Sequence, residues 1–580
     1  MNLITFNKNN RILLVAVASL FTLFFACDTT KKVVKMETAE TLASASTPSI
    51  NTAPFVGGGV ADSKGQPLRV KHVRKNAHKD TENMKILEEA LRKMKELPCT
   101  NPMSWYAQGA LHGAPRLGIP DNSKDTLIFY GNIFCDSLEY VQADNEAWHN
   151  CTHGAHRKLL DLNWDESRLH FYSWHKMYLN HFEEIIRYVS GKPDFSLPYW
   201  EYDNPSYQTL PKLLMDKNSS LYEAYRNDTL NQGGKIATNM FNDTRNCVTN
   251  ITNPENAFEA SSFESFTIHL ENVPHNVMHR YLGTYPTAKN PDPIGRDSEY
   301  GYMMNMYSPM DPVFWIHHAN IDRLYEKWLI QKIDDKFANG GRPTKQEFTN
   351  RKWVYKFYKA GATELTHYDD DLVAVFDDMY GVQNYAYDMW LNDGSYNRAY
   401  EDKVATAIEL GTWDEDEFPE IDILVASNDK DMNVPEEPTT IITVGGLGDF
   451  TCTGTEREVW LLRIDVRFAK VPTGSYGVYI QDQRDTSITC TEARAGIMTF
   501  FGAGHNHGAQ EAGHEDHPTG NMQETHFHFD VTNEIDFDKF SGDLRITVEP
   551  SDSDVKEEIT LDKIQLIKQI TSSRIVNRTD

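Results

Sequence analysis

Two adjacent histidines, His317 and His318, lie in the segment with the strongest chemical signal of the sequence, DPVFWIHHANIDRL. A proline suited to a helix N-terminus stands near its start, and the residues before the pair are apolar or aromatic. Burying two imidazoles in such a turn is costly unless something binds them. Asp322 lies four residues after His318, on the same helical face, where its carboxylate can orient an imidazole or cap the helix above it.

A second histidine pair, His275 and His279, precedes this segment in the sequence HNVMH. The two residues are one helical turn apart, so both ring nitrogens can point at one metal ion. The pair lacks the glutamate of the HExxH motif of zinc proteases. A set of imidazoles without carboxylates favours copper, zinc or iron, and copper suits an all-nitrogen site in an oxidising compartment.

Together, DPVFWIHHANIDRL and the preceding PHNVMH resemble the copper B motif of the family of tyrosinases, catechol oxidases and molluscan haemocyanins. In that family two copper ions are each held by three histidines. The resemblance implies that His275, His279 and His318 bind copper B, with His317 a neighbour rather than a ligand. Neutral imidazoles stabilise both oxidation states of copper, so such a pair can move two electrons from an organic reductant to O2.

The copper A half is expected earlier in the chain. The segment FYSWHKMYLNHFE is similar to the family's pattern F-x-x-W-H-R-x-x-L-x-x-x-E, which makes His175 the third copper A ligand. Lys176 stands where the family has arginine. The segment SWYAQGALHG resembles the one that supplies the first ligand, so the resemblance assigns this role to His112.

The second copper A ligand has two main candidates, and His149 and His156 are lesser ones. CTHG is similar to the family's Cys-x-His-Gly element, in which a thioether joins the cysteine to the copper-binding histidine, and this implies His153 as ligand and Cys151 as its partner. The family usually places this ligand nine residues before the third, where this chain has Glu166, so His153 requires an insertion. His170 is the alternative, nearer to His175 but at a position that the family fills with a non-ligand residue. We favour His153.

The resemblance implies that the chain oxidises o-diphenols to o-quinones with O2. Hydroxylation of monophenols would also require a carboxylate and an amide that hold a water molecule as base. Glu271 and Asn276 match the family's positions for that pair, and Arg280 stands at a position that influences substrate choice. Two blander interpretations remain open: Glu271 as a cap of the helix that starts near Pro274, and Arg280 as a surface charge.

Two other functions fit the same scaffold. One is reversible O2 transport of the haemocyanin type, and the other is oxidation of o-aminophenols. A single unit tethered to a cell surface has no evident use for cooperative O2 transport. An enzyme acting on a small phenolic substrate with O2 and two copper ions is therefore the preferred hypothesis.

The elements that position these residues follow from the sequence pattern. Apolar residues at helical spacing predict helices over 82–95, 171–189 and 312–332. Short β-favouring runs with turn residues between them follow at 439–444, 459–466, 476–480, 526–531 and 544–548. The expected fold is thus a mainly α catalytic domain, for which the resemblance implies a four-helix-bundle core holding both coppers, followed by a β-sandwich or barrel.

The resemblance also extends to the end of the catalytic domain. VFDD at 375–378 and YAY at 385–387 resemble the end of the core of plant-type polyphenol oxidases, in which a following β domain covers the active site and keeps the enzyme latent. We expect the following organisation: a lipoprotein-type signal peptide at 1–27, a flexible tether at 28–80, a tyrosinase-like dinuclear copper domain at 81–400, an acidic linker at 401–438 and a β-rich shielding domain at 439–570.

Charge and the N-terminus indicate the compartment and exclude some partners. The chain has 84 acidic and 57 basic residues, and the resulting net charge of −27 argues against nucleic acid or an anionic membrane face as partner. Lys8 and Arg11 precede an apolar run that ends at Cys27 and looks like a bacterial lipoprotein processing site. We expect an exported protein, periplasmic or at the cell surface, with membrane attachment through lipid on Cys27.

Overall fold

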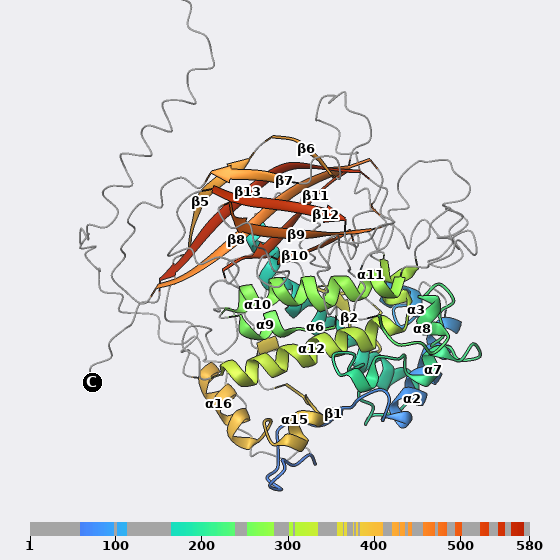
Figure 1. Cartoon of the computed structure of the whole chain (residues 1–580). Helices are drawn as coiled ribbons and strands as arrows, with labels where there is room; N and C mark the ends of the chain where they lie inside the picture. The colour runs from blue at the N-terminus through green and yellow to red at the C-terminus, as the bar shows by residue number, and fades with distance from the viewer. Residues whose placement is uncertain are drawn as a thin grey trace, which may run out of the picture. The chain divides into compact units, whose positions relative to one another are not determined.

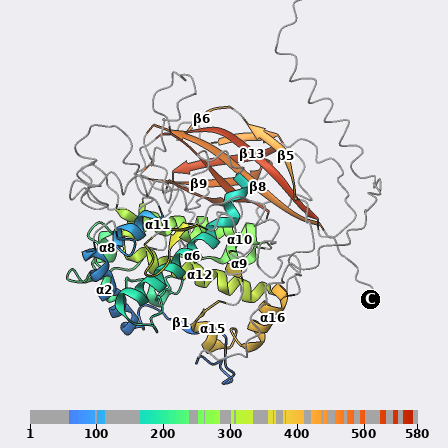
Figure 2. The same ribbon diagram turned by 180° about the vertical axis from the view of Figure 1, so that it is seen from behind.

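The computed structural model describes two parts of the chain, a helical part before residue 410 and a β-rich part after it (Figures 1 and 2). The described residues are 59–97, 101–112, 164–237, 252–260, 262–283, 301–304, 308–333, 356–363, 365–367, 375, 379–380, 383–409, 420–428, 430–434, 439–443, 456–469, 472, 474–483, 494–500, 523–532, 543–550 and 558–572. No helix within these ranges is both long and apolar enough to cross a lipid bilayer.

The three helices predicted from apolar spacing are all present. α2 (Thr81–Glu96) begins at Asp80, whose side chain accepts a hydrogen bond from the backbone N–H of Asn83, as N-cap residues do. α6 (Trp164–Ser190) and α12 (Val313–Lys332) are the two long helices of the part of the chain that is described, and they pack against each other. This confirms the predicted helical catalytic region.

A kinked helical segment crosses this part of the structure. α10 (Phe263–Leu270) continues into η5 (Glu271–Asn276) and α11 (Val277–Gly283) without a loop. Pro274 lacks the N–H that a helix needs, and Val273 before it has extended backbone angles, so the helix axis bends at this point. The bend presents successive turns of one segment to the same interior region.

The shorter elements frame these helices. Those of the helical part are β1 (His72–Arg74), α3 (Trp105–Ala110), η4 (Pro205–Tyr207), α7 (Lys212–Met215), α8 (Asp228–Asn231), α9 (Glu255–Glu259), η6 (Tyr302–Met304), η7 (Ser308–Met310), β2 (Lys356–Tyr358), β3 (Leu365–His367), β4 (Tyr385–Tyr387), α15 (Asp388–Asp393) and α16 (Arg398–Glu409).

Strand β1 lies inside the segment for which the sequence predicted a flexible tether, 28–80. It pairs in parallel with β4, so the two ends of the helical part meet. Leu68 and Val70 before it are buried in the main core. The composition of this segment gives no sign of such order, because its partners lie far away in the sequence: the carboxylate of Glu401 accepts hydrogen bonds from the backbone N–H groups of Arg69 and Val70.

The helical part ends with α16, and the β-rich part begins at Glu420 with β5 (Glu420–Asn428). Both α16 after residue 400 and β5 fall within 401–438, the segment predicted as an acidic linker. Acidic side chains on the outer face of a helix or strand produce the same composition as a linker. The pattern alone therefore does not separate these two possibilities.

Two antiparallel sheets make up the β-rich part (Figure 1). One has the order β10 (Arg494–Thr499), β9 (Ser475–Asp482), β12 (Asp543–Pro550) and β7 (Thr439–Thr443). The other has the order β11 (Gln523–Asp530), β8 (Glu456–Phe468), β13 (Ile559–Ser572) and β5, with β6 (Met432–Val434) also paired to β13. Alternate residues of both sheets, such as Leu462 and Val478, share one apolar core. This confirms the predicted fold class and makes the β-rich part a sandwich.

Candidate metal centre

Five of the predicted metal ligands gather in the interior of the helical part. They are His112, two residues after α3, His175 in α6, His275 in η5, His279 in α11 and His318 in α12. All of them are buried. The sixth predicted ligand, His153, and its proposed thioether partner Cys151 lie outside the described residues. The backbone of the alternative, His170, belongs to α6, and its side chain is outside the description.

His112 and His175 form the first group. Their Nε2 atoms are 3.4 Å apart. The Nδ1 atom of His175 lies 2.7 Å from the carbonyl oxygen of Phe171, an acceptor that fixes the proton on Nδ1. The Nε2 lone pair of His175 is thereby directed toward His112, which is the arrangement of a histidine that binds metal through Nε2.

The second group consists of His275, His279, His317 and His318, each of which offers a ring nitrogen within 4.8 Å of the others. The Nε2 atoms of His279 and His318 are 3.2 Å apart. This group contains the adjacent pair and the one-turn pair that the sequence singled out. It unites α11, η5 and α12, so the kink at Pro274 and the packing of α12 build it together.

Two of these rings are oriented by oxygen acceptors on Nδ1. His275 Nδ1 lies 2.9 Å from Oδ1 of Asn276, and His279 Nδ1 lies 2.9 Å from the carbonyl oxygen of Met303. The second contact depends on Gly283, because a Cβ there would lie 2.5 Å from the backbone nitrogen of Met304. Both contacts leave Nε2 as the nitrogen that faces the other imidazoles.

The two groups adjoin. The rings of His175 and His318 stack with centroids 4.5 Å apart, and His175 and His275 are 6.0 Å apart. Phe171 packs edge-on against His275 at 4.8 Å, and Phe314 contacts His318 at 4.1 Å, so aromatic rings enclose the imidazoles. The site is therefore one enclosed set of imidazoles from separate helices.

Burial keeps these histidines neutral. It lowers the pKa of His175 to about 3, and it lowers the pKa of His275, His279 and His318 well below the usual range, with neighbouring imidazoles adding to the effect in His275 and His318. Neutral imidazole is the form that binds metal ions. Both ring nitrogens of His317 and Nδ1 of His318 find no hydrogen-bond partner among the described residues. Unpartnered buried nitrogens are costly, and the Nε2 atoms of His112, His175, His279 and His318, which face one another in pairs at 3.4 and 3.2 Å, are a donor set that fits a bound metal ion.

A buried network of hydrogen bonds and ion pairs surrounds Asp322, one turn after His318 in α12. Asp322 accepts hydrogen bonds from Arg74 at 2.9 Å, from Lys176 at 3.0 Å and from Tyr385 at 2.5 Å. Burial alone would raise the pKa of Asp322, but Lys176 and Arg74 outweigh it and hold the pKa at about 2. The sequence predicted that Asp322 orients an imidazole or caps the helix. The structure shows instead that it binds these cations and tyrosines.

Sequence reasoning missed Arg74 and did not give Lys176 a role. Arg74 lies within the predicted tether, so no motif marked it. Lys176 could have been found, because it stands where the family pattern has arginine and directly follows a predicted ligand.

The three predicted catalytic residues lie on one segment. Glu271 is half-buried at the junction of α10 and η5, and the side chain of Asn276 contacts Nδ1 of His275. Arg280 lies in α11 and is buried, with 5% of its surface exposed. The burial of Arg280 excludes the interpretation of this residue as a surface charge. Glu271 and Asn276 occupy the first and last positions of η5, the element that also contains His275.

Comparisons with known proteins agree on one family. The family described as the common central domain of tyrosinase matches residues 102–262 and 223–331. Polyphenol oxidase II of Ipomoea batatas is 26% identical over 317 residues, which are 50% of this chain and 45% of that protein. Tyrosinase HcTyr1 of Hahella sp. (strain CCB-MM4) is 28% identical over 267 residues, covering 42% and 50% of the two chains. Catechol oxidase B of Solanum tuberosum is 31% identical over 209 residues, 32% of each chain. The match thus spans half or less of these relatives.

Solved structures with the same fold cover more of the chain. Latent aurone synthase, a polyphenol oxidase, aligns with a TM-score of 0.53 at 18% identity over 87% of this chain and 90% of its own. Latent apple tyrosinase aligns with a TM-score of 0.51 at 19% identity over 87% and 97% of the two chains. At this identity the likeness concerns the fold, and it extends over both the helical and the β-rich part.

Proposed function

Since the chain belongs to the family of tyrosinases and polyphenol oxidases, we propose that it is a copper-dependent enzyme that oxidises o-diphenols to o-quinones with O2. The observation that carries this proposal is the convergence of two imidazole groups, His112 with His175 and His279 with His318, around stacked rings. The sequence similarity of the relatives named polyphenol oxidase, catechol oxidase and tyrosinase supports it.

We assign the two coppers to the two groups. His112, His153 and His175 would hold copper A, with Cys151 joined to His153 by a thioether. His275, His279 and His318 would hold copper B. The oriented Nε2 atoms and the neutral state of the imidazoles support this assignment.

The bound copper pair would supply the redox chemistry, accepting the electrons of the phenol and passing them to O2. Each o-diphenol loses two electrons and two protons, and two turnovers reduce one O2 to two water molecules. The chain's part is to fix the rings that hold the metals, to keep bulk water out with Phe171 and Phe314, and to remove protons. Glu271 and Asn276 would hold the water that takes the phenolic proton, which also permits hydroxylation of monophenols. Arg280, buried on the next turn, would influence substrate choice.

The β-rich part would shield this site. Ser265 of α10 hydrogen-bonds to Asp530 of β11, and Ile268 packs with Leu461 of β8 in a small apolar cluster. Ile497 of β10 is part of the main core of the helical part. These contacts join residues of the sandwich to the segment that continues into η5, which supports the proposed shielding. The related structures of latent enzymes have the same two-part fold, which fits a shielding role.

For the location, we propose export and lipid attachment at Cys27. The basic residues and apolar run before Cys27 support it. Labelling of the expressed protein with a radioactive fatty acid tests it: label on the wild type and none on Cys27→Ala is the expected result. Label on neither protein would contradict lipid attachment at Cys27.

The proposed activity is tested with the purified, copper-loaded chain and a simple catechol. We expect stoichiometric O2 uptake and the new visible absorbance of an o-quinone, both lost in His318→Gln. Reversible O2 binding without quinone would instead indicate a carrier. A clear preference for o-aminophenol in a substrate panel would indicate an o-aminophenol oxidase.

A further inference from the structure

Lys176 and Asp322 connect the two helices that carry the two histidine groups. Lys176 directly follows His175 in α6, and Asp322 lies one turn after His318 in α12. The ammonium of Lys176 donates to Oδ1 of Asp322 at 3.0 Å, and the side chains are only 1% and 2% exposed. The Lys176–Asp322 contact, called the tie below, is therefore a buried ion pair between the two helices that carry the two halves of the candidate metal centre.

Asp322 is fixed in position by many donors. Besides Lys176, it accepts hydrogen bonds from Arg74 and from the hydroxyls of Tyr172, Tyr385 and Tyr387. Tyr172 also accepts a hydrogen bond from Lys176 at 3.0 Å. A carboxylate held by donors from three separate elements, α6, β1 and β4, has little freedom to shift.

Each buried carboxylate of this network has a buried cation as partner, and Glu183 also pairs with the partly exposed Arg187 at 3.1 Å. Arg74 pairs with Glu183 of α6 at 2.7 Å as well as with Asp322 at 2.9 Å, so two buried cations face two buried anions. A buried ion pair contributes little net stability, but removing one partner leaves an uncompensated charge. What such a network does provide is a defined geometry, here the position of α6 relative to α12.

α6 and α12 each carry one proposed ligand, His175 of copper A and His318 of copper B, so their spacing bears on both proposed sites. The rings of His175, one residue before Lys176, and His318, one turn before Asp322, stack with centroids 4.5 Å apart. A change in helix spacing would move one histidine group against the other without disturbing the contacts inside either group.

We propose that the Lys176–Asp322 ion pair sets the distance between the two coppers, so that Lys176 is a positioning residue. This inference rests on the proposed function, because it presupposes that both groups bind copper. It assigns to Lys176 a role in the geometry of the pair rather than in binding either ion.

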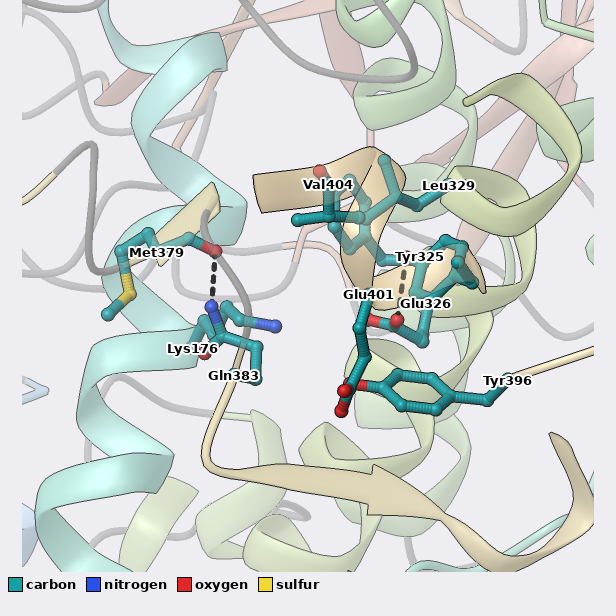
Figure 3. A pocket seen from close by; sticks show the side chains of 10 residues that line it. Lys176, Tyr325, Glu326, Leu329, Met379, Gln383, Tyr396, Glu401 and Val404 are labelled. Atoms are coloured by element: carbon teal, nitrogen blue, oxygen red, sulfur yellow. Dashed lines mark hydrogen bonds between the residues drawn. The ribbon is translucent and has the colours of Figure 1, made fainter. Parts of the chain in front are cut away.

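A small cavity beside Lys176 shows which replacement the site can accept. Lys176 lines it together with Glu326 and Glu401, which lie across the cavity from it (Figure 3). The cavity has room for about one water molecule. A guanidinium is larger than an ammonium and can extend into this space while still donating to Asp322. We therefore expect Lys176→Arg to keep the tie, whereas Lys176→Met removes it.

The test compares copper content and the electron paramagnetic resonance signal of the Cu(II)-loaded proteins. Two Cu(II) ions that share a bridging ligand couple their spins and give almost no signal, whereas separated ions give the full one. We expect wild type and Lys176→Arg to hold two coppers per chain and to be nearly silent. Lys176→Met should hold two coppers with a signal at least several-fold larger. Lys176→Gln, whose shorter and neutral side chain also lacks the ion pair, should give the same enlarged signal and keeps the test open if the Met variant folds poorly.

Lys95→Met is the matched control. Lys95 is also a largely buried lysine, but it donates to the carbonyl of Ser220 at 2.7 Å and does not bridge α6 and α12. It should stay silent like wild type. A silent, two-copper Lys176→Met or Lys176→Gln protein would overturn the inference. A wild-type protein that binds no copper pair would instead overturn the proposed function itself.

Discussion

The imidazole rings of His175 and His318 stack face to face, with centroids 4.5 Å apart and planes inclined by 7°. His175 belongs to α6 and His318 to α12, so the contact exists only when these helices pack against each other. Each ring also faces a histidine of its own group, His112 at 3.4 Å and His279 at 3.2 Å between Nε2 atoms. This stacked pair is the junction of the two proposed copper sites.

Of the two adjacent histidines, His318 should be the ligand. Its Nε2 lies 3.2 Å from that of His279, whereas the ring of His317 lies between those of His275 and Tyr202, stacked on each at 5.6 Å. We expect His318→Gln to bind one copper per chain and His317→Gln to bind two, measured by elemental analysis. The reverse result would exchange their roles.

For the second copper A ligand, His153→Ala should cost one copper per chain and His170→Ala none. The reason is the Cys-x-His-Gly resemblance around His153. Elemental analysis of both variants beside wild type decides between the two. Intact mass adds an independent readout: the thioether makes the reduced wild type two hydrogens lighter, and Cys151→Ser should abolish that deficit.

Removal of the β-rich part should raise activity. A chain that ends at Glu409 keeps α16 and loses the contacts of Ser265 and Ile268 with the sandwich. We expect its kcat/KM for a catechol to exceed that of the full chain by about tenfold, which corresponds to about 1.4 kcal/mol of lost shielding. Equal values for the two proteins would contradict the shielding role.

A point substitution tests the same interface without truncation. A Cβ at Gly496 of β10 would lie 2.4 Å from Phe529 of the sandwich core and 3.3 Å from the amide nitrogen of Asn272 in η5, so Gly496→Val should disturb both the packing of β10 and its contact with η5 and raise activity several-fold. Gly477→Val is the matched control. A Cβ at Gly477 would crowd Tyr479 at 2.8 Å within the sandwich. The three nearest atoms to that Cβ all belong to Tyr479 and none to Asn272.

The docking of the sandwich should weaken in acid because of His269. Burial lowers the pKa of His269 below its usual value of 6.5. The negative charges of Asp530, 3.8 Å away, and Glu259 raise this pKa but only partly offset the effect of burial. Above pH 6.5 both states carry a neutral ring and docking is complete. As the pH falls below 6.5, the undocked state takes up the proton first, so docking loses stability.

The measurement is the activity of the full chain relative to the chain ending at Glu409. We expect this ratio to rise as the pH is lowered from 7 to 5, and to rise less in His269→Gln, which cannot take up a proton. An identical pH dependence in wild type and His269→Gln would rule out His269 as the responsible group.

The sequence was informative wherever the relevant contacts are local. His275 and His279 are one turn apart, and apolar spacing predicted α2, α6 and α12 because a helix repeats its buried face within a few residues. The approach of His112 to His175 could be inferred only through the family resemblance, since α3 and α6 meet by tertiary packing. Arg74 escaped prediction altogether, because its partners Glu183 and Asp322 are far away in the chain and its own neighbourhood resembles a tether.

The most direct test of the account is a copper titration of the metal-free protein, followed by elemental analysis and by the thermal unfolding midpoint. We predict two tightly bound coppers per wild-type chain and a higher midpoint when they are bound, because a ligand that binds only the folded state stabilises it. His175→Ala with His318→Gln should abolish both effects. A wild-type chain that binds no copper, or whose copper is unaffected by the double substitution, would contradict the assignment of this histidine centre.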